Sequence, residues 1–160
     1  MPLLINQNIV SDDSWRLVDE TTTDLSGDII VPLELHTDEP EKFADQQGRI
    51  AILVGKNESI ETLMAEPNQY ELIVIDFSNF GEGRGFSFAN MLRRSGYTGQ
   101  LRATGYVTRD RLECMQRCGF DAFDIPAEHY DSDDAKAWSE ISVNYQGAAD
   151  NSQPIYHQKG

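Results

Sequence analysis

The sequence predicts an α/β protein with a parallel sheet of about four βα units, either open or curled into a half-barrel, preceded by a short N-terminal β hairpin. Four short apolar runs have the composition of strands that are buried on both faces. Stretches with helical periodicity separate these runs. Strands that alternate with helices in this way form parallel sheets, because each helix returns the chain to the start of the next strand.

The N-terminal part of the chain has the composition of β structure. Leu3–Val10 and Trp15–Glu20 are apolar-rich runs separated by Ser11-Asp12-Asp13, which is a hairpin signal. Ile29–His36 is a further strand candidate. Pro32 cannot donate a hydrogen bond to a strand ladder, so we expect it at an edge or an end.

The central part supplies the repeated βα units. Thr37–Gly48, before them, is acidic and polar and is expected to be a short helix or a loop. The four buried strands are expected at Arg49–Gly55, Leu72–Phe77, Leu101–Val107 and Ala122–Ile125. The apolar faces of the intervening helices are expected to be Ile60, Leu63 and Met64, then Phe88, Met91 and Leu92, then Leu112, Met115 and Cys118. Asn57 or Ser59 can cap the first of these helices; Pro67, Gly96 and Gly119 are expected to end them.

The C-terminal part predicts one more helix, from about Asp133 to Tyr145. Ser132 is a favourable N-cap residue, and Ala135, Trp138, Ile141 and Tyr145 form an apolar stripe. Residues 147–160 show no periodicity and are expected to be a flexible tail. Residues 1–146 are therefore predicted to form a single α/β domain with an N-terminal β extension.

Composition excludes several classes of protein. The formal net charge of −14 argues against binding to nucleic acid or to anionic membrane surfaces. No apolar run approaches the roughly 20 residues needed to span a bilayer. The chain begins MPLLINQ, which lacks the basic region of a secretory signal, and it has two cysteines. We therefore expect a cytoplasmic protein.

The positive charge is concentrated in one stretch. Between Arg84 and Arg117 there are seven arginines, no lysine and two carboxylates, a net charge of +5, so the remainder of the chain carries −19. One interpretation is a solvated helix face on an acidic protein. The other is a cationic surface for an anionic ligand or partner, for which the planar guanidinium group is well suited.

A glycine-rich loop lies at the start of this stretch. Gly81–Ser87 follows a predicted strand and opens a helix, the place where parallel α/β proteins bind ligands. Free backbone N–H groups at a helix start attract anions, and we predict Gly83, Arg84, Gly85 and Ser87 as ligand-binding residues. Phe86 stands where a dinucleotide fingerprint requires glycine, and no lysine follows as in a P-loop. The alternative is a tight turn with Ser87 as the helix cap.

Further candidates come from the same strand ends. Arg102, Gly105 and Arg109 are predicted to join the ligand site. Asp76, Glu82 and Asp110 are candidate acid–base residues. The alternatives are that Asp110 caps its helix, and that Asp76 braces the loop through a hydrogen bond or pairs with Arg84.

The cysteines and histidines do not form a recognisable cofactor site. Cys114 and Cys118 are spaced to share one helix face, and they are either a thiol pair or buried small hydrophobic residues. Two ligands alone hold neither zinc nor an iron–sulfur cluster well. His36, His129 and His157 are scattered and are expected at the surface. We therefore expect no cofactor and no metal.

Three segments resemble a known family. They are Phe80–Arg93 (FGEGRGFSFANMLR), Gly99–Asp110 (GQLRATGYVTRD) and Arg117–Phe123 (RCGFDAF). They resemble the bacterial domain-of-unknown-function family 934. The resemblance is strong over Asp76–Phe123 and weak over the first fifty residues. Where the family pattern has Asp-Gly-Arg, this chain has Glu82-Gly83-Arg84.

The resemblance implies a pathway. Members of this family are often labelled oxidoreductases involved in sulfite reduction, because their genes tend to lie beside those of sulfite reductase. We expect an accessory protein of assimilatory sulfite reduction that assists sulfite reductase. The alternatives are a small enzyme or oxidoreductase acting on a sulfated or phosphorylated metabolite at Gly83–Ser87, and a structural interaction domain. The residues leave open whether the chain is catalytic.

Overall fold

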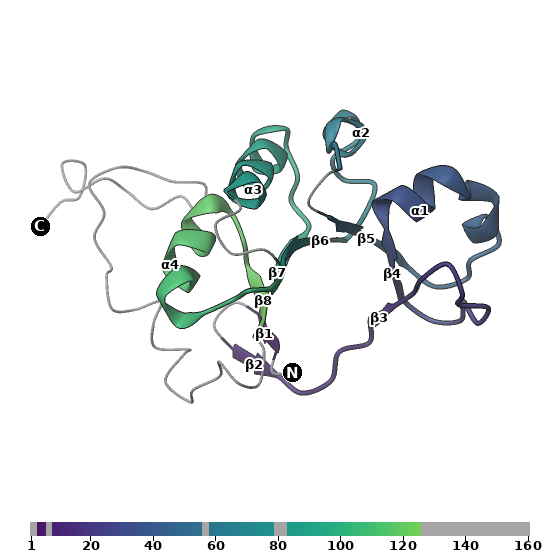
Figure 1. The fold of residues 1–160 in the computed structure, drawn as a ribbon, viewed down its shortest axis with the longest axis horizontal. Coiled ribbons are helices and arrows are strands. Elements are labelled where there is room, and N and C mark those ends of the chain that lie inside the picture. Colours follow the sequence, from purple (N-terminus) through teal and green to yellow (C-terminus); the bar gives the residue numbers. More distant parts are fainter. Residues whose placement is uncertain (1–2, 6–7, 56–57, 79–82, 126–160) are drawn as a thin grey trace, which may run out of the picture.

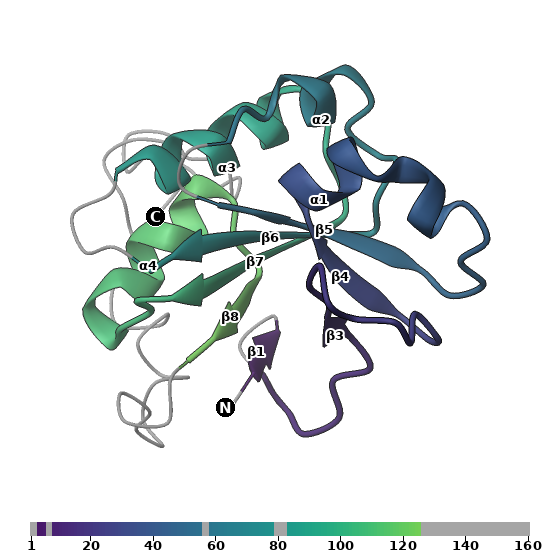
Figure 2. The same cartoon turned by 45° about the vertical axis from the view of Figure 1, so that its right-hand side comes forward.

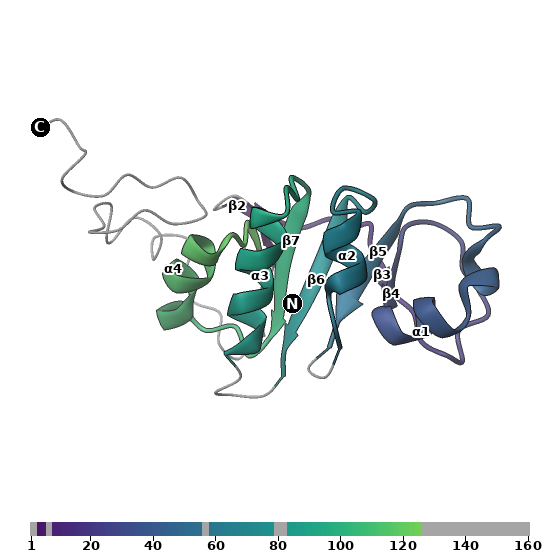
Figure 3. The same ribbon diagram turned by 90° about the horizontal axis from the view of Figure 1, so that it is seen from above.

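The computed structural model describes residues 3–5, 8–55, 58–78 and 83–125. Over these residues the chain forms one sheet with strand order β2-β1-β8-β7-β6-β5-β4-β3. The sheet curls into a half-barrel, and the helices lie on its outer face (Figures 1 and 3). The α/β class is thus confirmed, and of the two forms left open for the parallel sheet the structure has the half-barrel.

The elements follow one another as alternating strands and helices along most of the chain. They are β1 (Leu3–Ile5), β2 (Asn8–Val10), β3 (Arg16–Leu17), β4 (Ile29–Pro32), α1 (Leu33–Asp38), the 3-10 helix η1 (Pro40–Phe43), β5 (Ile50–Val54), α2 (Glu61–Ala65), β6 (Leu72–Phe77), α3 (Arg84–Arg94), β7 (Gln100–Gly105), α4 (Arg109–Cys118) and β8 (Ala122–Asp124).

The N-terminal hairpin exists, but its strands are not the two that the sequence suggested. The first apolar run folds back on itself, so that β1 pairs antiparallel with β2, and β1 also pairs antiparallel with β8. The second run contributes β3, which pairs parallel with β4 at the opposite edge of the sheet. From β3 to β8 all neighbouring strands are parallel.

A short connection forces the sheet to curl. Strands β2 and β3 are the two edges of the eight-stranded sheet, yet only residues 11–15 join them. Such a segment spans at most about 20 Å, whereas the edges of a flat sheet of this size would be about 34 Å apart. The segment crosses the open side of the half-barrel (Figures 1 and 2), and we call residues 11–15 the strap.

The two faces of the sheet have different cores. The outer face packs against the helices in a large cluster that includes Ile73, Ile75 and Phe77 of β6. The inner face carries a smaller cluster of Ile30, Ala51, Leu72 and Val74, against which Trp15 and Leu53 also pack. Because side chains alternate along a strand, both faces of the central strands are apolar, as the continuous runs predict.

Helix faces and ends largely follow the sequence pattern. Phe88, Ala89 and Leu92 of α3 are buried, but Met91 is 40% exposed, so the prediction for Met91 was wrong. Close packing at Gly85 centres the buried stripe on residues 85, 88, 89 and 92, which leaves Met91 at its margin. Helix α4 ends at Gly119, whose left-handed φ of 115° is a conformation that glycine adopts readily.

The Ile29–His36 strand is shorter than predicted. It ends at Pro32, which confirms the place of the proline at a strand end, and Leu33–Asp38 forms α1 instead. Proline has no N–H for the ladder, and it is tolerated at the start of a helix. Within Thr37–Gly48 the structure has η1, one of the two outcomes expected.

The predicted helix from Asp133 to Tyr145 and the tail 147–160 lie outside the described residues, as do Asn57, Glu82, His129 and His157. His36 is half-buried rather than at the surface, and it stacks on Phe43. Among the described helices, none is both long and apolar enough to cross a membrane.

Candidate functional site at the carboxyl ends of β6 and β7

Strands β6 and β7 lie side by side in the middle of the sheet and end together. Phe77 is the register partner of Gly105, the last residue of β7, and Tyr106 N donates a hydrogen bond of 2.9 Å to Phe77 O. The segments that follow the two strands therefore leave the sheet next to each other. This is the edge at which parallel α/β proteins bind ligands.

The carboxylate of Asp76 lies at this edge, close to Gly105 of the neighbouring strand. Ser78 Oγ donates a hydrogen bond to Asp76 Oδ2. Gly105 has a φ of 85°, and a Cβ at that position would lie 2.5 Å from Asp76 Oδ1. The carboxylate thus occupies the space that only a glycine leaves open, so Asp76 and Gly105 form one structural unit.

The predicted loop becomes the start of α3. Gly83 is the N-cap residue of α3, with helical backbone angles and no side-chain capping hydrogen bond. Ser87 lies within the first turn, where its N–H donates to Gly83 O, so the interpretation of Ser87 as the helix cap was wrong. Gly85 lets α3 approach the sheet, because a Cβ there would be 2.6 Å from Phe77 Cε1.

We predict that Gly85→Ala lowers the free energy of unfolding by about 1–3 kcal/mol, because the added methyl group overpacks against Phe77 and Ile75. Gly83→Ala is the matched control, because a Cβ at Gly83 would meet nothing within 4 Å. Urea unfolding of both variants measures the difference. Equal stabilities would show that α3 can move away from the sheet without cost.

Two arginines flank this start of α3. The guanidinium of Arg84 lies over the ring of Phe88, with its Cζ atom 5.1 Å from the ring centroid. Arg111, from α4, lies among the rings of Phe77, Phe86 and Tyr106, at 5.4–5.7 Å from their centroids. Its Nη1 also donates a 2.9 Å hydrogen bond to Tyr106 O.

Arg111 was missed as a site residue by sequence reasoning, which selected Arg109 instead. Arg109 is the exposed first residue of α4. Arg111 is partly buried and connects α4 to β6 and to α3 through Phe77 and Phe86. The available signal was the helical spacing, because Arg111 stands four residues before the fully buried Met115 and therefore lies on the same face of α4.

Asp110 accepts a hydrogen bond from the N-cap side chain but is not itself the helix cap, so that interpretation was wrong. Thr108 is the N-cap residue of α4, and its Oγ donates a 2.6 Å hydrogen bond to Asp110 Oδ1. A carboxylate in the first turn of a helix is favoured by the helix dipole. Asp110 lies at the same sheet edge as Asp76, because it follows the carboxyl end of β7 and Asp76 is the last but one residue of the neighbouring β6.

Arg102 lies on the other face of the sheet from the helices. Its neighbours in β7, Leu101 and Ala103, pack into the outer core, so Arg102 points to the inner side of the half-barrel. There its Nη1 makes an ion pair of 2.8 Å with Asp13 of the strap. The structure therefore separates Arg102 from the Gly83–Ser87 segment, which belongs to the helix layer.

Partial burial raises the pKa values of two carboxyl groups, that of Asp121 just before β8 and that of Asp124 at its end. Burial raises the pKa of Asp121 above its usual value, although the Leu101 N–H and the Arg93 guanidinium act in the opposite direction. Burial also raises the pKa of Asp124, which faces Arg102, Asp13 and Thr104. Asp124 belongs to the inner face, and its carboxyl group adds a further titratable group near Arg102.

The two cysteines differ in environment. Cys118 is partly buried against the outer core, whereas Cys114 is exposed, so the prediction of buried small hydrophobic residues was wrong for Cys114. Burial raises the pKa of the Cys118 thiol, and the nearby Cys114 contributes to the shift. Among the residues that the structure describes, no three His, Cys, Asp or Glu residues are grouped as metal ligands.

Cys118→Ala is expected to lower the free energy of unfolding by about 1 kcal/mol, because it removes a group packed against the core. Cys114→Ala, one turn earlier on the exposed face, is expected to be nearly neutral. Denaturant unfolding checks both variants under reducing conditions. A fully stable Cys118→Ala variant would contradict the packing role.

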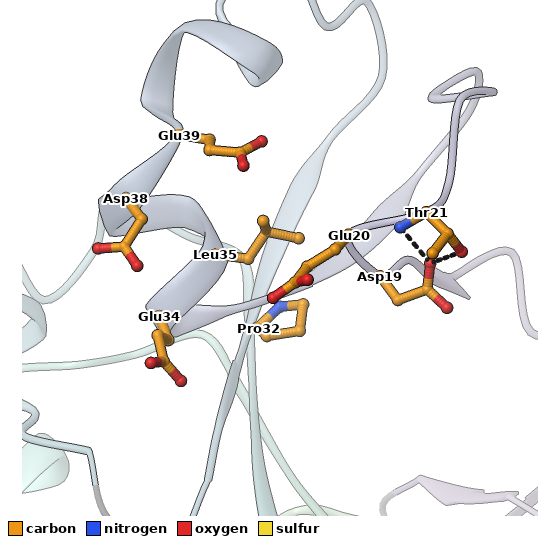
Figure 4. A pocket seen from close by; sticks show the side chains of 8 residues that line it. All are labelled: Asp19, Glu20, Thr21, Pro32, Glu34, Leu35, Asp38 and Glu39. Atoms are coloured by element: carbon orange, nitrogen blue, oxygen red, sulfur yellow. Dashed lines mark hydrogen bonds between the residues drawn. The ribbon is translucent and has the colours of Figure 1, made fainter.

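A second group of strand ends forms an acidic pocket. It has a volume of about 440 Å³, is lined from α1 and from the segment after β3, and lies at the ends of β3 and β4 (Figure 4). The lining residues are Asp19, Glu20, Thr21, Pro32, Glu34, Leu35, Asp38 and Glu39. Five carboxylates around one pocket repel anions, so it is not a second site for the kind of ligand expected at β6 and β7.

Comparison with protein families identifies the family to which the chain belongs. The sequence model of a family described as bacterial protein of unknown function (DUF934) matches residues 51–156. The chain belongs to this family. Comparison with curated proteins and with solved structures found no match. The DUF934 segment includes the whole edge formed by β6, β7, α3 and α4, whereas strands β1–β4 and the strap precede it.

Proposed function

We propose that this DUF934 protein is an accessory protein of assimilatory sulfite reduction and assists sulfite reductase. The observation that supports this most directly is the family match over residues 51–156, because the resemblance that implies the pathway is to the same family. All residues of the β6–β7 edge lie inside the matched segment. The proposal therefore places the functional surface at this edge.

The chemistry of the edge supports an anionic ligand or an anionic patch on a partner. Helix α3 starts there, and the first backbone N–H groups of a helix have no partner within the helix and attract negative charge. Arg84 comes from the first turn of α3 and lies over Phe88, and Arg111 of α4 reaches the same turn through its contact with Phe86. The two guanidinium groups add positive charge around this helix start, which favours an anionic ligand or partner.

Affinity purification of the tagged protein from bacteria grown on sulfate tests the proposal. We expect sulfite reductase to be recovered with the wild type and with Arg94→Ala, and to be reduced at least tenfold with Arg84→Ala. Arg94 is the matched control, because it is an exposed arginine on the same helix. Recovery of sulfite reductase at equal levels with all three proteins would exclude this edge as the contact surface.

The second candidate is a small enzyme that acts on an anionic metabolite at the same edge. Asp76 favours it, because its carboxylate is positioned by Ser78 and by the close approach of Gly105. Melting curves of wild type and Arg84→Ala with sulfate, sulfite and phosphate distinguish the candidates. If one of the anions raises the melting temperature of the wild type but not that of Arg84→Ala, the result supports a ligand at the start of α3. If Arg84→Ala melts at a lower temperature than the wild type and no anion changes either value, Arg84 has a structural role only.

A further inference from the structure

The strap is attached to the inner face of the half-barrel mainly through side chains. Ser14 Oγ donates to Asp28 Oδ2 at 3.3 Å, and the ring of Trp15 lies under the guanidinium of Arg49. Asp13, which precedes Ser14 in the strap, forms an ion pair with Arg102 on β7. Residues 11–14 are exposed, so this contact joins an exposed segment to a buried residue.

The guanidinium of Arg102 is buried and is bound by the strap from one side. Only 4% of its side chain is exposed, compared with 34% for Asp13. Nη1 donates to Asp13 Oδ2 at 2.8 Å, and Nη2 donates to Asp13 Oδ1 at 3.4 Å. Nη2 also donates to Gln100 Oε1 at 3.1 Å. Both oxygens of one carboxylate therefore face the two terminal nitrogens of the guanidinium.

One polar atom of Arg102 has no partner among the residues that the structure describes. Its Nε is buried and makes no hydrogen bond. A buried N–H without a partner costs free energy, and a charged group costs more than a neutral one. Two polar side chains lie near this guanidinium. Burial raises the pKa of the Asp124 carboxyl group of β8, and Arg102 is close enough for its positive charge to oppose this rise. Thr104 forms a hydrogen bond with the same carboxyl group.

We propose that Arg102 is an anion-binding centre of the half-barrel, occupied in this structure by the Asp13 carboxylate of the strap. The ligand is a small oxyanion that presents two oxygens on one side, as a carboxylate, sulfite or sulfate does. Such an oxyanion replaces Asp13 when the strap moves. It can then bind side-on through Nη2 and Nε, and its second oxygen accepts the proton of Nε, which Asp13 leaves unbound. This site is separate from the β6–β7 edge and does not depend on the function proposed there.

The geometry favours an oxyanion over other ligands. A guanidinium offers a planar fork of donors that matches two oxygens and has no acceptor, so a cation or a neutral donor cannot replace Asp13. The inner cluster of Ile30, Ala51, Leu72 and Val74 lies on the same face, and an apolar surrounding strengthens a charge pair. Since Asp124 adds negative charge, the site suits an anion of low charge.

Calorimetric titration with sodium sulfite, sulfate and acetate at constant ionic strength tests the proposal, with chloride as the control anion. Asp13→Ala removes the internal carboxylate, and Asp12→Ala removes the same charge from the neighbouring exposed residue. We expect Asp13→Ala to bind at least one of the three oxyanions tenfold or more tightly than either the wild type or Asp12→Ala. Asp13→Asn, which keeps an acceptor for Arg102, is measured in parallel in case Asp13→Ala does not fold.

The double variant Asp13→Ala, Arg102→Met identifies the binding group. Replacing a buried ion pair by an apolar side chain of similar length is often neutral for stability, so this variant is expected to fold. Loss of the oxyanion binding in the double variant supports Arg102 as the centre. Persistence of the binding in the double variant, or equal binding by the wild type and the Asp13 variants, would overturn the proposal and leave the pair as a structural contact.

Discussion

Arg93→Ala is expected to lower the free energy of unfolding by about 3 kcal/mol, one of the two largest effects among the substitutions considered. Arg93 is the last but one residue of α3, and its guanidinium donates to three backbone oxygens. These are Tyr97 O at 3.0 Å and Gly99 O at 2.8 Å before β7, and Gly119 O at 2.9 Å before β8. One side chain thus joins two successive βα units.

The substitution also leaves the partly buried carboxylate of Asp121 without its cation. Arg93 forms an ion pair with Asp121, whose pKa is already raised by burial. Without Arg93 the pKa of Asp121 rises further. A raised pKa means that the folded protein disfavours the ionised carboxylate. The stability lost in Arg93→Ala is therefore smallest at low pH, where Asp121 is protonated in both the folded and the unfolded state. The loss grows as the pH rises through the raised pKa.

Urea unfolding at several pH values measures both effects. Arg94→Ala is the control, because Arg94 is the adjacent arginine and is exposed. A change of less than about 0.5 kcal/mol is expected for the control at every pH. If Arg93→Ala and Arg94→Ala were equally stable, Arg93 would not hold the two units together. This result would favour a solvated arginine face instead.

Gly105→Ala is expected to lower the free energy of unfolding by about 3 kcal/mol or more, from backbone strain and overpacking together. The φ of 85° at Gly105 is unfavourable for alanine. In addition, the new Cβ would lie 2.5 Å from Asp76 Oδ1 and 2.8 Å from the backbone of Phe77 and Ser78. The substitution therefore also moves Asp76 from its present position.

Gly27→Ala separates the two causes. Gly27 has a similar φ of 79°, but a Cβ there would meet nothing within 4 Å. The control thus reports strain alone, about 1 kcal/mol. Thermal unfolding of both variants gives the difference that is due to the close approach of Asp76. Equal losses would mean that the Asp76 carboxylate moves aside freely and is not held by Gly105.

The local elements could be predicted because their signals are local. The apolar run Leu72–Phe77 coincides with β6, and Gly96 and Gly119 follow the ends of α3 and α4. Met91 was misplaced because a spacing of three residues fits a helix face only approximately, and packing at Gly85 decides which side faces the sheet.

Contacts between distant segments could not be predicted in this way. Arg102 and Asp13 are 89 residues apart, and nothing near either residue identifies its partner. The pairing of β3 with β4 depends on the strap crossing the half-barrel, which is a property of the whole sheet. The carboxyl ends of parallel strands meet at one edge of a sheet, and this property of the topology is enough to place Asp76, Gly105 and Asp110 at the same edge.

Growth of a deletion strain on defined sulfur sources tests the proposed role in sulfite reduction most directly. We predict that bacteria without this gene grow at the wild-type rate on sulfide or cysteine and grow more slowly on sulfite or sulfate as the sole sulfur source. The wild-type gene and Arg94→Ala should restore growth on sulfite, and Arg84→Ala should not. Normal growth of the deletion strain on sulfite, or an equal defect on sulfide, would contradict a function in this pathway.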